Sequence, residues 1–269
     1  MMRNAMILAG AALLVASNFV LAETPEEKGL AIAVEGQKRN EGWVDSQVDL
    51  KMVLTNKQGE TSERNMKLRA LEVISDVDGD KSLTYFLSPA DVEGTALLSF
   101  TKITTPDDQW LYLPALKRVK RIASANKSGS FVGSEFAFED LLAQEVAKFK
   151  YKFLREEPCP TPESQSLTCF VSERYPVYEN SGYTKQIGWT DKTEYRIWKL
   201  DFFDRKEEQS KTLIFSDYRQ YLDKFWRAHT LSMENHITGK KTSLVFGTYT
   251  LKAGVDQSQF DPDSLARLR

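Results

Sequence analysis

Apolar and polar residues alternate with a period of two along most of the chain, a pattern typical of β-strands with one covered face. The alternation is clearest from Trp43 onward, where one face would carry Val44, Ser46, Val48, Leu50, Met52 and Leu54. Short turns such as the one at residues 56–59 predict an antiparallel meander. Further strands are expected at residues 62–75, 83–87, 96–103, 110–113, 118–123, 148–155, 167–174, 185–190, 195–203, 211–218, 225–235 and 241–249.

Helical patterns are few and short. The first helix begins after Thr24, which can form a capping box with Glu27, and Pro25 suits the first helical position. Its apolar face would consist of Leu30, Ala31, Ala33 and Val34. Further short helices are expected at residues 139–147 and 261–265. No Gly/Ser-rich linker or break in composition divides residues 23–269, so we expect one mainly β domain (α+β) of about eleven strands and a few helices.

Residues 1–22 have the features of a signal peptide. Arg3 supplies a positive charge, residues 5–15 are apolar, and small or tolerated residues precede a cleavage site after Ala22. The alternative, a membrane anchor, is disfavoured because the apolar run is short and is interrupted by Ser17 and Asn18. No cysteine follows the cleavage site, so we expect an exported protein that is not itself a lipoprotein.

Charge and motifs argue against several functional classes. The net charge is −2, and removing Arg3 makes it −3, which disfavours nucleic acid as a partner. No hydrolase, kinase or phosphate-binding motif is present, and His229 and His236 lie seven apart, on opposite faces of one predicted strand. Residues 76–82 lack the glycine and glutamate spacing of a calcium loop and are read as a hairpin turn. We therefore expect that the protein is not an enzyme and that it has no metal site or cofactor. An uncharacterised hydrolase is the remaining alternative.

Cys159 and Cys169, the only two cysteines, flank a Pro-containing stretch. In an oxidising compartment this spacing favours a disulfide that closes a loop between two strands. A free reactive pair is the alternative, and a metal site is disfavoured because no histidine or third cysteine lies nearby.

The aromatic content favours a binding module. A β-rich frame holding 15 Phe, 10 Tyr and 5 Trp could line an apolar ligand cavity, or the same side chains could simply fill a core. Periodicity does not distinguish the two. The candidate cavity-lining residues are Val48, Leu50, Met52, Met66, Leu68, Trp110, Tyr112, Phe131, Phe136, Phe138 and Leu141.

A basic run follows the strand at residues 110–113 and places cations on both faces of the next strand. Its members are Lys117, Arg118, Lys120 and Arg121. This pattern indicates an edge or rim of the sheet. The cations could contact an anionic partner or a lipid headgroup, or they could form a solvated edge that resists aggregation.

Residues 107–141 carry the most specific motif: a Trp-Leu-Tyr-Leu-Pro strand, the basic strand, and then Ser-Phe, Gly-Ser, Phe and Glu-Asp-Leu. This order resembles the signature of the outer-membrane lipoprotein-sorting family, which is similar to the periplasmic carrier LolA. Later segments also resemble that family: a Trp-x-Asp-Lys strand end at residues 189–192, and Trp226, Met233, Asn235, Thr238-Gly239 and Thr242. The family's shorter carrier latches its lid with one arginine, for which Arg64 and Arg69 are the candidates here.

The resemblance implies a single curved antiparallel sheet forming a half-open barrel, with helices covering its concave face. It also implies a periplasmic monomer that binds lipid or lipoprotein acyl chains and moves them between the membranes. Longer members of the family are often paired with an inner-membrane transporter of the resistance-nodulation-division (RND) class, and an outer-membrane acceptor would receive the cargo. The alternative is a lipid-sensing regulator on the same fold that binds a membrane-anchored partner.

Overall fold

The computed structural model describes residues 23–267, so the predicted signal peptide lies outside the described residues. One α-helix, α1 (Pro25–Arg39), precedes the sheet, and Thr24 and Glu27 form the predicted capping box. The strands are β1 (Asp45–Thr55), β2 (Thr61–Leu71), β3 (Asp78–Ser88), β4 (Ala96–Lys102), β5 (Asp108–Leu113), β6 (Arg118–Arg121), β7 (Phe149–Pro158), β8 (Thr168–Pro176), β9 (Tyr183–Asp191), β10 (Ile197–Asp204), β11 (Gln209–Tyr221), β12 (Phe225–Asn235), β13 (Lys241–Phe246) and β14 (Thr250–Leu251).

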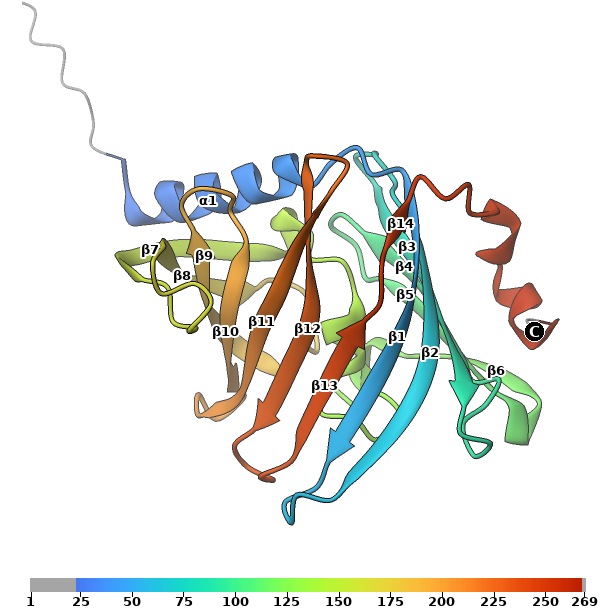
Figure 1. Ribbon diagram of the computed structural model, residues 1–269. Helices are drawn as coiled ribbons and strands as arrows, with labels where there is room; N and C mark the ends of the chain where they lie inside the picture. The colour runs from blue at the N-terminus through green and yellow to red at the C-terminus, as the bar shows by residue number, and fades with distance from the viewer. Residues whose placement is uncertain (1–22, 268–269) are drawn as a thin grey trace, which may run out of the picture.

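All fourteen strands belong to one curved antiparallel sheet that does not close (Figure 1). The strand order is β6-β5-β4-β3-β2-β1-β13-β12-β11-β10-β9-β8-β7, and β14 pairs with β1. The sheet thus consists of two meanders that meet where β1 pairs with β13. The half-open barrel expected from the sequence is confirmed, with fourteen strands instead of about eleven.

This strand order determines the path of residues 122–148, which we call the inner segment. β6 and β7 are the two opposite edges of the sheet, so the chain must cross from one edge to the other. It crosses the concave face, where Phe131 and Phe136 pack in the main core with Met52, Met66 and Phe86. The sheet is therefore filled partly by its own connection.

Several local predictions were wrong. The helix expected at residues 139–147 is replaced by two short 3-10 turns, Phe138–Leu141 and Val146–Lys148, with extended chain between them. The C-terminal helix is also a 3-10 helix, Pro262–Arg267. Val44 has a positive φ of 68° and is exposed, so β1 begins only at Asp45. β2 ends at Leu71 because the chain then turns into the bend before β3.

Helix α1 packs through a different face from the one predicted. Gly29 and Ile32 are its buried residues, whereas Leu30 and Val34 are exposed. At Gly29 the helix lies so close to the edge strand β7 that a Cβ would stand 2.8 Å from the Phe153 backbone nitrogen. The helix therefore covers β7 and leaves part of its apolar surface on the concave side.

Candidate functional site

The concave face encloses an inner cavity of about 400 Å³. Its walls come from residues of β1 to β4 and β8 to β13, and the inner segment covers it. The structure brings seven of the predicted lining residues together here: Leu50, Met52, Met66, Leu68, Phe131, Phe136 and Leu141. Most of the surface is apolar, so the site can hold a hydrocarbon group.

An outer cavity of about 1670 Å³ lies between the inner one and α1. Leu68, Leu200, Leu231 and Phe246 line both cavities, so the two adjoin. The sequence analysis missed the contribution of the second meander. The signal was present in the alternating residues of 211–218 and 225–235, but nothing in the sequence identified which strands would face those of the first meander.

Four of the predicted lining residues do not line either cavity. Trp110 and Tyr112 face the convex side, where they pack against a second core that contains Phe260 and Leu265. Leu111, between them, faces the concave core. The prediction therefore assigned the two faces of this strand the wrong way round. Phe138 is buried in the core of the concave face. Val48 is buried opposite Leu68, outside the cavity lining.

Two acidic residues of the family motif fix the inner segment to the sheet. The carboxylate of Glu139 accepts hydrogen bonds from the Tyr178 and Ser181 hydroxyls, at 3.0 and 2.9 Å, and from the Gly182 N–H at 2.7 Å. Asp140 accepts from the Ala137 N–H and the Tyr183 hydroxyl. Burial raises the pKa of Asp140 to about 6. The Glu-Asp-Leu motif therefore has a positioning role beneath the cavity.

The turn of the inner segment is held by residues of β12 and β13. The Glu135 N–H donates to the Thr242 hydroxyl at 3.0 Å, and the Asn235 amide donates to the Glu135 carboxylate at 2.6 Å. Arg64 donates to the Val132 carbonyl, whereas Arg69 donates to Gln259 on the convex side. Of the two candidate latch arginines, Arg64 is therefore the one that contacts the inner segment.

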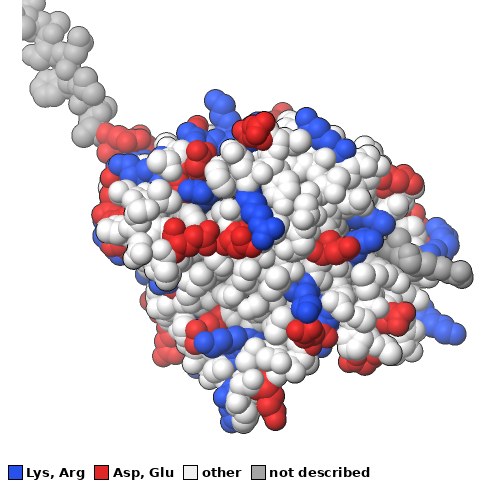
Figure 2. All heavy atoms as spheres, in the orientation of Figure 1, with Lys and Arg blue, Asp and Glu red and all other residues white. Residues whose placement is uncertain are grey.

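The basic run forms an exposed sheet edge, and none of its four members lines the inner or the outer cavity. Lys117 precedes β6, an edge strand that carries Arg118, Lys120 and Arg121 with their side chains exposed. Arg121 forms an ion pair with Asp108 of the neighbouring strand. On the face seen in Figure 2, basic and acidic side chains are interspersed.

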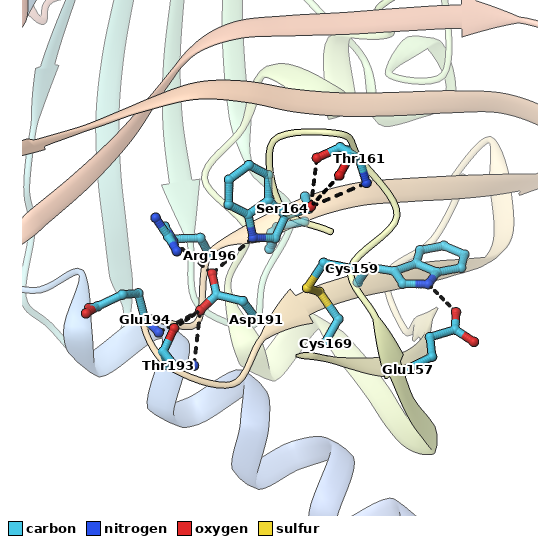
Figure 3. Close-up of a disulfide and its surroundings, with 12 residues drawn as sticks. Glu157, Cys159, Thr161, Ser164, Cys169, Asp191, Thr193, Glu194 and Arg196 are labelled. Carbon is cyan, nitrogen blue, oxygen red and sulfur yellow. Dashed lines mark hydrogen bonds and ion pairs between the residues drawn. A yellow bond between two sulfur atoms is a disulfide. The ribbon is translucent and has the colours of Figure 1, made fainter. Parts of the chain in front are cut away.

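The predicted disulfide between Cys159 and Cys169 is confirmed, with Cα atoms 5.0 Å apart (Figure 3). It joins the end of β7 to the start of β8 in a third core that includes Trp189 and Trp198. Nearby, Asp191 accepts hydrogen bonds from Trp198 and from Arg196 (Figure 3). Asp191 thus organises the turn between β9 and β10.

The histidines are separated in space. His229 is buried and shares hydrogen bonds with the Tyr221 hydroxyl and the Phe246 carbonyl, while His236 lies just beyond β12. Within residues 23–267, no group of three or more His, Cys, Asp or Glu side chains is placed to hold a metal ion. None of the helices in this range is long and apolar enough to cross a membrane.

Comparison with known proteins supports the family resemblance. A family model described as "Uncharacterized protein" matches residues 78–267. A domain from Vibrio parahaemolyticus assigned to outer membrane lipoprotein sorting is 50% identical, with a TM-score of 0.85 over 90% of this chain and 100% of that one. A DUF1329 family protein from Desulfovibrio piger is 26% identical, with a TM-score of 0.83 over 90% of this chain and 99% of that one.

A more distant structure shows the same fold. A LolA superfamily protein from Nitrosomonas europaea is 16% identical, with a TM-score of 0.67 over 87% of this chain and 98% of that one. No curated protein matches the chain. The resemblance inferred from residues 107–141 is thereby confirmed.

Proposed function

This chain belongs to the outer membrane lipoprotein-sorting protein family, and on that premise we propose that it is a periplasmic carrier of lipid or lipoprotein acyl chains. The acyl chains occupy the cavity of the concave face while the protein moves them between the inner and outer membranes. The observation that carries the proposal is the pair of adjoining cavities, of about 400 and 1670 Å³, between the sheet, the inner segment and α1.

The lining of the inner cavity suits a hydrocarbon chain. Leu50, Met52, Leu213 and Leu244 present aliphatic or thioether groups to it, and Phe131 closes one side. Each methylene that moves from water into such a site contributes roughly 0.8 kcal/mol. Methionine side chains adapt to chains of different shape, which suits a carrier that accepts more than one acyl group.

The wider role follows from the leader and the family. The predicted signal peptide would export the protein to the periplasm, where a monomer could travel between membranes. An inner-membrane transporter of the RND class would supply the cargo, and an outer-membrane acceptor would receive it.

A pair of variants on neighbouring strands tests acyl-chain binding. Leu231 on β12 lines both cavities, whereas Val245 on β13 is exposed on the other face of the sheet. We expect Leu231→Glu to weaken binding of a fluorescent fatty acid at least tenfold, because the carboxylate stays solvated and keeps water in the cavity. Val245→Glu should bind as the wild type does.

Native mass spectrometry of protein purified from its own periplasm would identify the cargo. Phospholipid or acylated peptide should co-purify with the wild type and with Val245→Glu, and be lost from Leu231→Glu. An empty wild-type protein that also fails to take up the fluorescent fatty acid would exclude the carrier. The lipid-sensing alternative predicts instead a stable complex with a membrane-anchored partner.

A further inference from the structure

Arg174 is a basic side chain that lies where the inner and outer cavities meet, and it lines both, as the acidic Asp80 also does. It belongs to β8, where Tyr151 of β7 and Gln186 of β9 are its direct partners in register. Its Nε donates a hydrogen bond to Gln186 Oε1 at 2.7 Å, and its guanidinium carbon lies 4.9 Å from the centre of the Phe149 ring. The side chain is therefore held in a fixed orientation by neighbours that carry no charge.

No ion pair neutralises this arginine within residues 23–267. Other basic groups near the second meander do have acidic partners: Arg196 lies 2.8 Å from Asp191, and Lys211 lies 3.9 Å from Asp140. Asp140 acts on Arg174 only from a distance, and it is already engaged by the Ala137 N–H and the Tyr183 hydroxyl. Burial lowers the pKa of Arg174, because desolvation disfavours its charged form.

Tyr151 of the neighbouring strand β7 is a second donor beside Arg174. Its side chain lines the outer cavity, and burial raises its pKa to about 12, so its hydroxyl keeps its proton at neutral pH. A half-buried cation without a counter-ion costs free energy. A ligand with anionic oxygens would supply the missing negative charge.

We propose that Arg174, with Tyr151, binds the anionic head of an acyl amphiphile whose hydrocarbon chain enters the inner cavity. The head is a phosphate or a carboxylate, since either presents oxygens to the guanidinium and to the Tyr151 hydroxyl. This inference rests on the proposed function and adds to it the charge and the orientation of the cargo. The acyl chain points toward Phe131, and the charged end lies toward the outer cavity.

Paired ligands of one chain length test the assignment. Dodecanoic acid and monododecyl phosphate carry the proposed head, whereas methyl dodecanoate lacks the charge. Binding is measured at pH 8 by displacement of N-phenyl-1-naphthylamine, a neutral apolar dye. We expect wild-type protein to bind both anions at least tenfold more tightly than the ester, since a charge-assisted hydrogen bond is worth about that factor or more.

Variants then assign the preference to one residue. Arg174→Gln should lose the tenfold preference while it still binds the ester, and Arg174→Lys should retain part of it. Arg219→Gln is the matched control, because Arg219 is an exposed arginine paired with Asp217 on β11. It should behave as the wild type does. Circular dichroism checks that each variant is folded. If Arg174→Gln is unfolded, the ligand preference of the wild type and that of Arg174→Lys decide whether Arg174 binds the head.

The outcomes separate the two proposals. If the wild type binds acid and ester equally and Arg174→Gln changes neither, the head-binding role is wrong while the carrier function stands. If the wild type binds neither the dye nor any dodecyl ligand, the proposed function fails and this inference fails with it. If inorganic phosphate displaces monododecyl phosphate at equal concentration, the site takes small anions and the amphiphile is excluded.

Discussion

At the scale of single residues, Gly29 and Gly36 of α1 have the same backbone role but different surroundings. A Cβ at Gly29 would lie 2.8 Å from the backbone nitrogen of Phe153 and 2.9 Å from that of Lys152. A Cβ at Gly36 would meet nothing closer than 3.9 Å. Gly29 is therefore required by close packing of the helix on an edge strand, and Gly36 is not.

These surroundings predict that alanine at the two positions changes the free energy of unfolding in opposite directions. Gly29→Ala should lower the free energy of unfolding by about 1–3 kcal/mol, because the backbone of β7 cannot move aside as a side chain can. Gly36→Ala should raise it by about 0.5–1 kcal/mol, since alanine favours the helix. Urea unfolding of the two variants checks this, and equal effects at both positions would show that α1 does not pack on β7 as described.

At the scale of elements, the β7–β8 connection is stabilised by a covalent bond within an otherwise irregular loop. The loop runs from Cys159 to Cys169, and a small core of Val171, Trp189 and Trp198 lies beside the bond. β7 is an edge strand with one sheet neighbour, so less of the sheet holds it in place. The disulfide limits the freedom of this edge in the unfolded chain.

Removal of the disulfide should destabilise the protein measurably. For a bond between residues ten apart, Cys159→Ser with Cys169→Ser is expected to lower the free energy of unfolding by about 2–3 kcal/mol. A reducing agent should lower the urea midpoint of the wild type to that of the double variant, and should leave the midpoint of the double variant unchanged. A double variant as stable as the oxidised wild type would contradict this.

At the scale of the whole molecule, the cavity makes global stability depend on pH. Burial raises the pKa of Asp80, which lines both cavities, from 3.8 to about 6. Between these values the folded state binds more protons than the unfolded state. The free energy of unfolding contributed by Asp80 therefore falls as pH rises from about 4 to 6.

Asp80→Asn should remove this dependence, because the amide keeps an oxygen that can accept from the Val73 N–H. We expect the variant to be about 2–3 kcal/mol more stable than the wild type at pH 7.5, and less so at pH 4.5. Thermal or urea unfolding at the two pH values measures the difference.

Asp256→Asn is a control for which the pH dependence of stability should have the opposite sign. Hydrogen bonds from Ser258 lower the pKa of Asp256, so that carboxylate stabilises the fold above its unfolded pKa and loses this effect as pH falls.

A gain in stability of Asp80→Asn that is the same at both pH values would show that Asp80 is not desolvated.

The sequence by itself determined the local features of this protein. The period of two predicts most strands, the Thr24–Glu27 capping box fixes the start of α1, and the spacing of Cys159 and Cys169 predicts the disulfide. These features depend on residues close together in the chain. The motif of residues 107–141 identified the family and hence the curved sheet.

Only the tertiary structure decided which residues surround the cavity. The alternation does not reveal which face of a strand is concave when both faces are covered, as in β5, where Trp110 packs under the C-terminal segment and Leu111 faces the inner segment. The isolation of Arg174 from any acidic partner also depends on strands distant in sequence. Both outcomes come from long-range packing, because burial and charge pairing are properties of three-dimensional surroundings that no local pattern records.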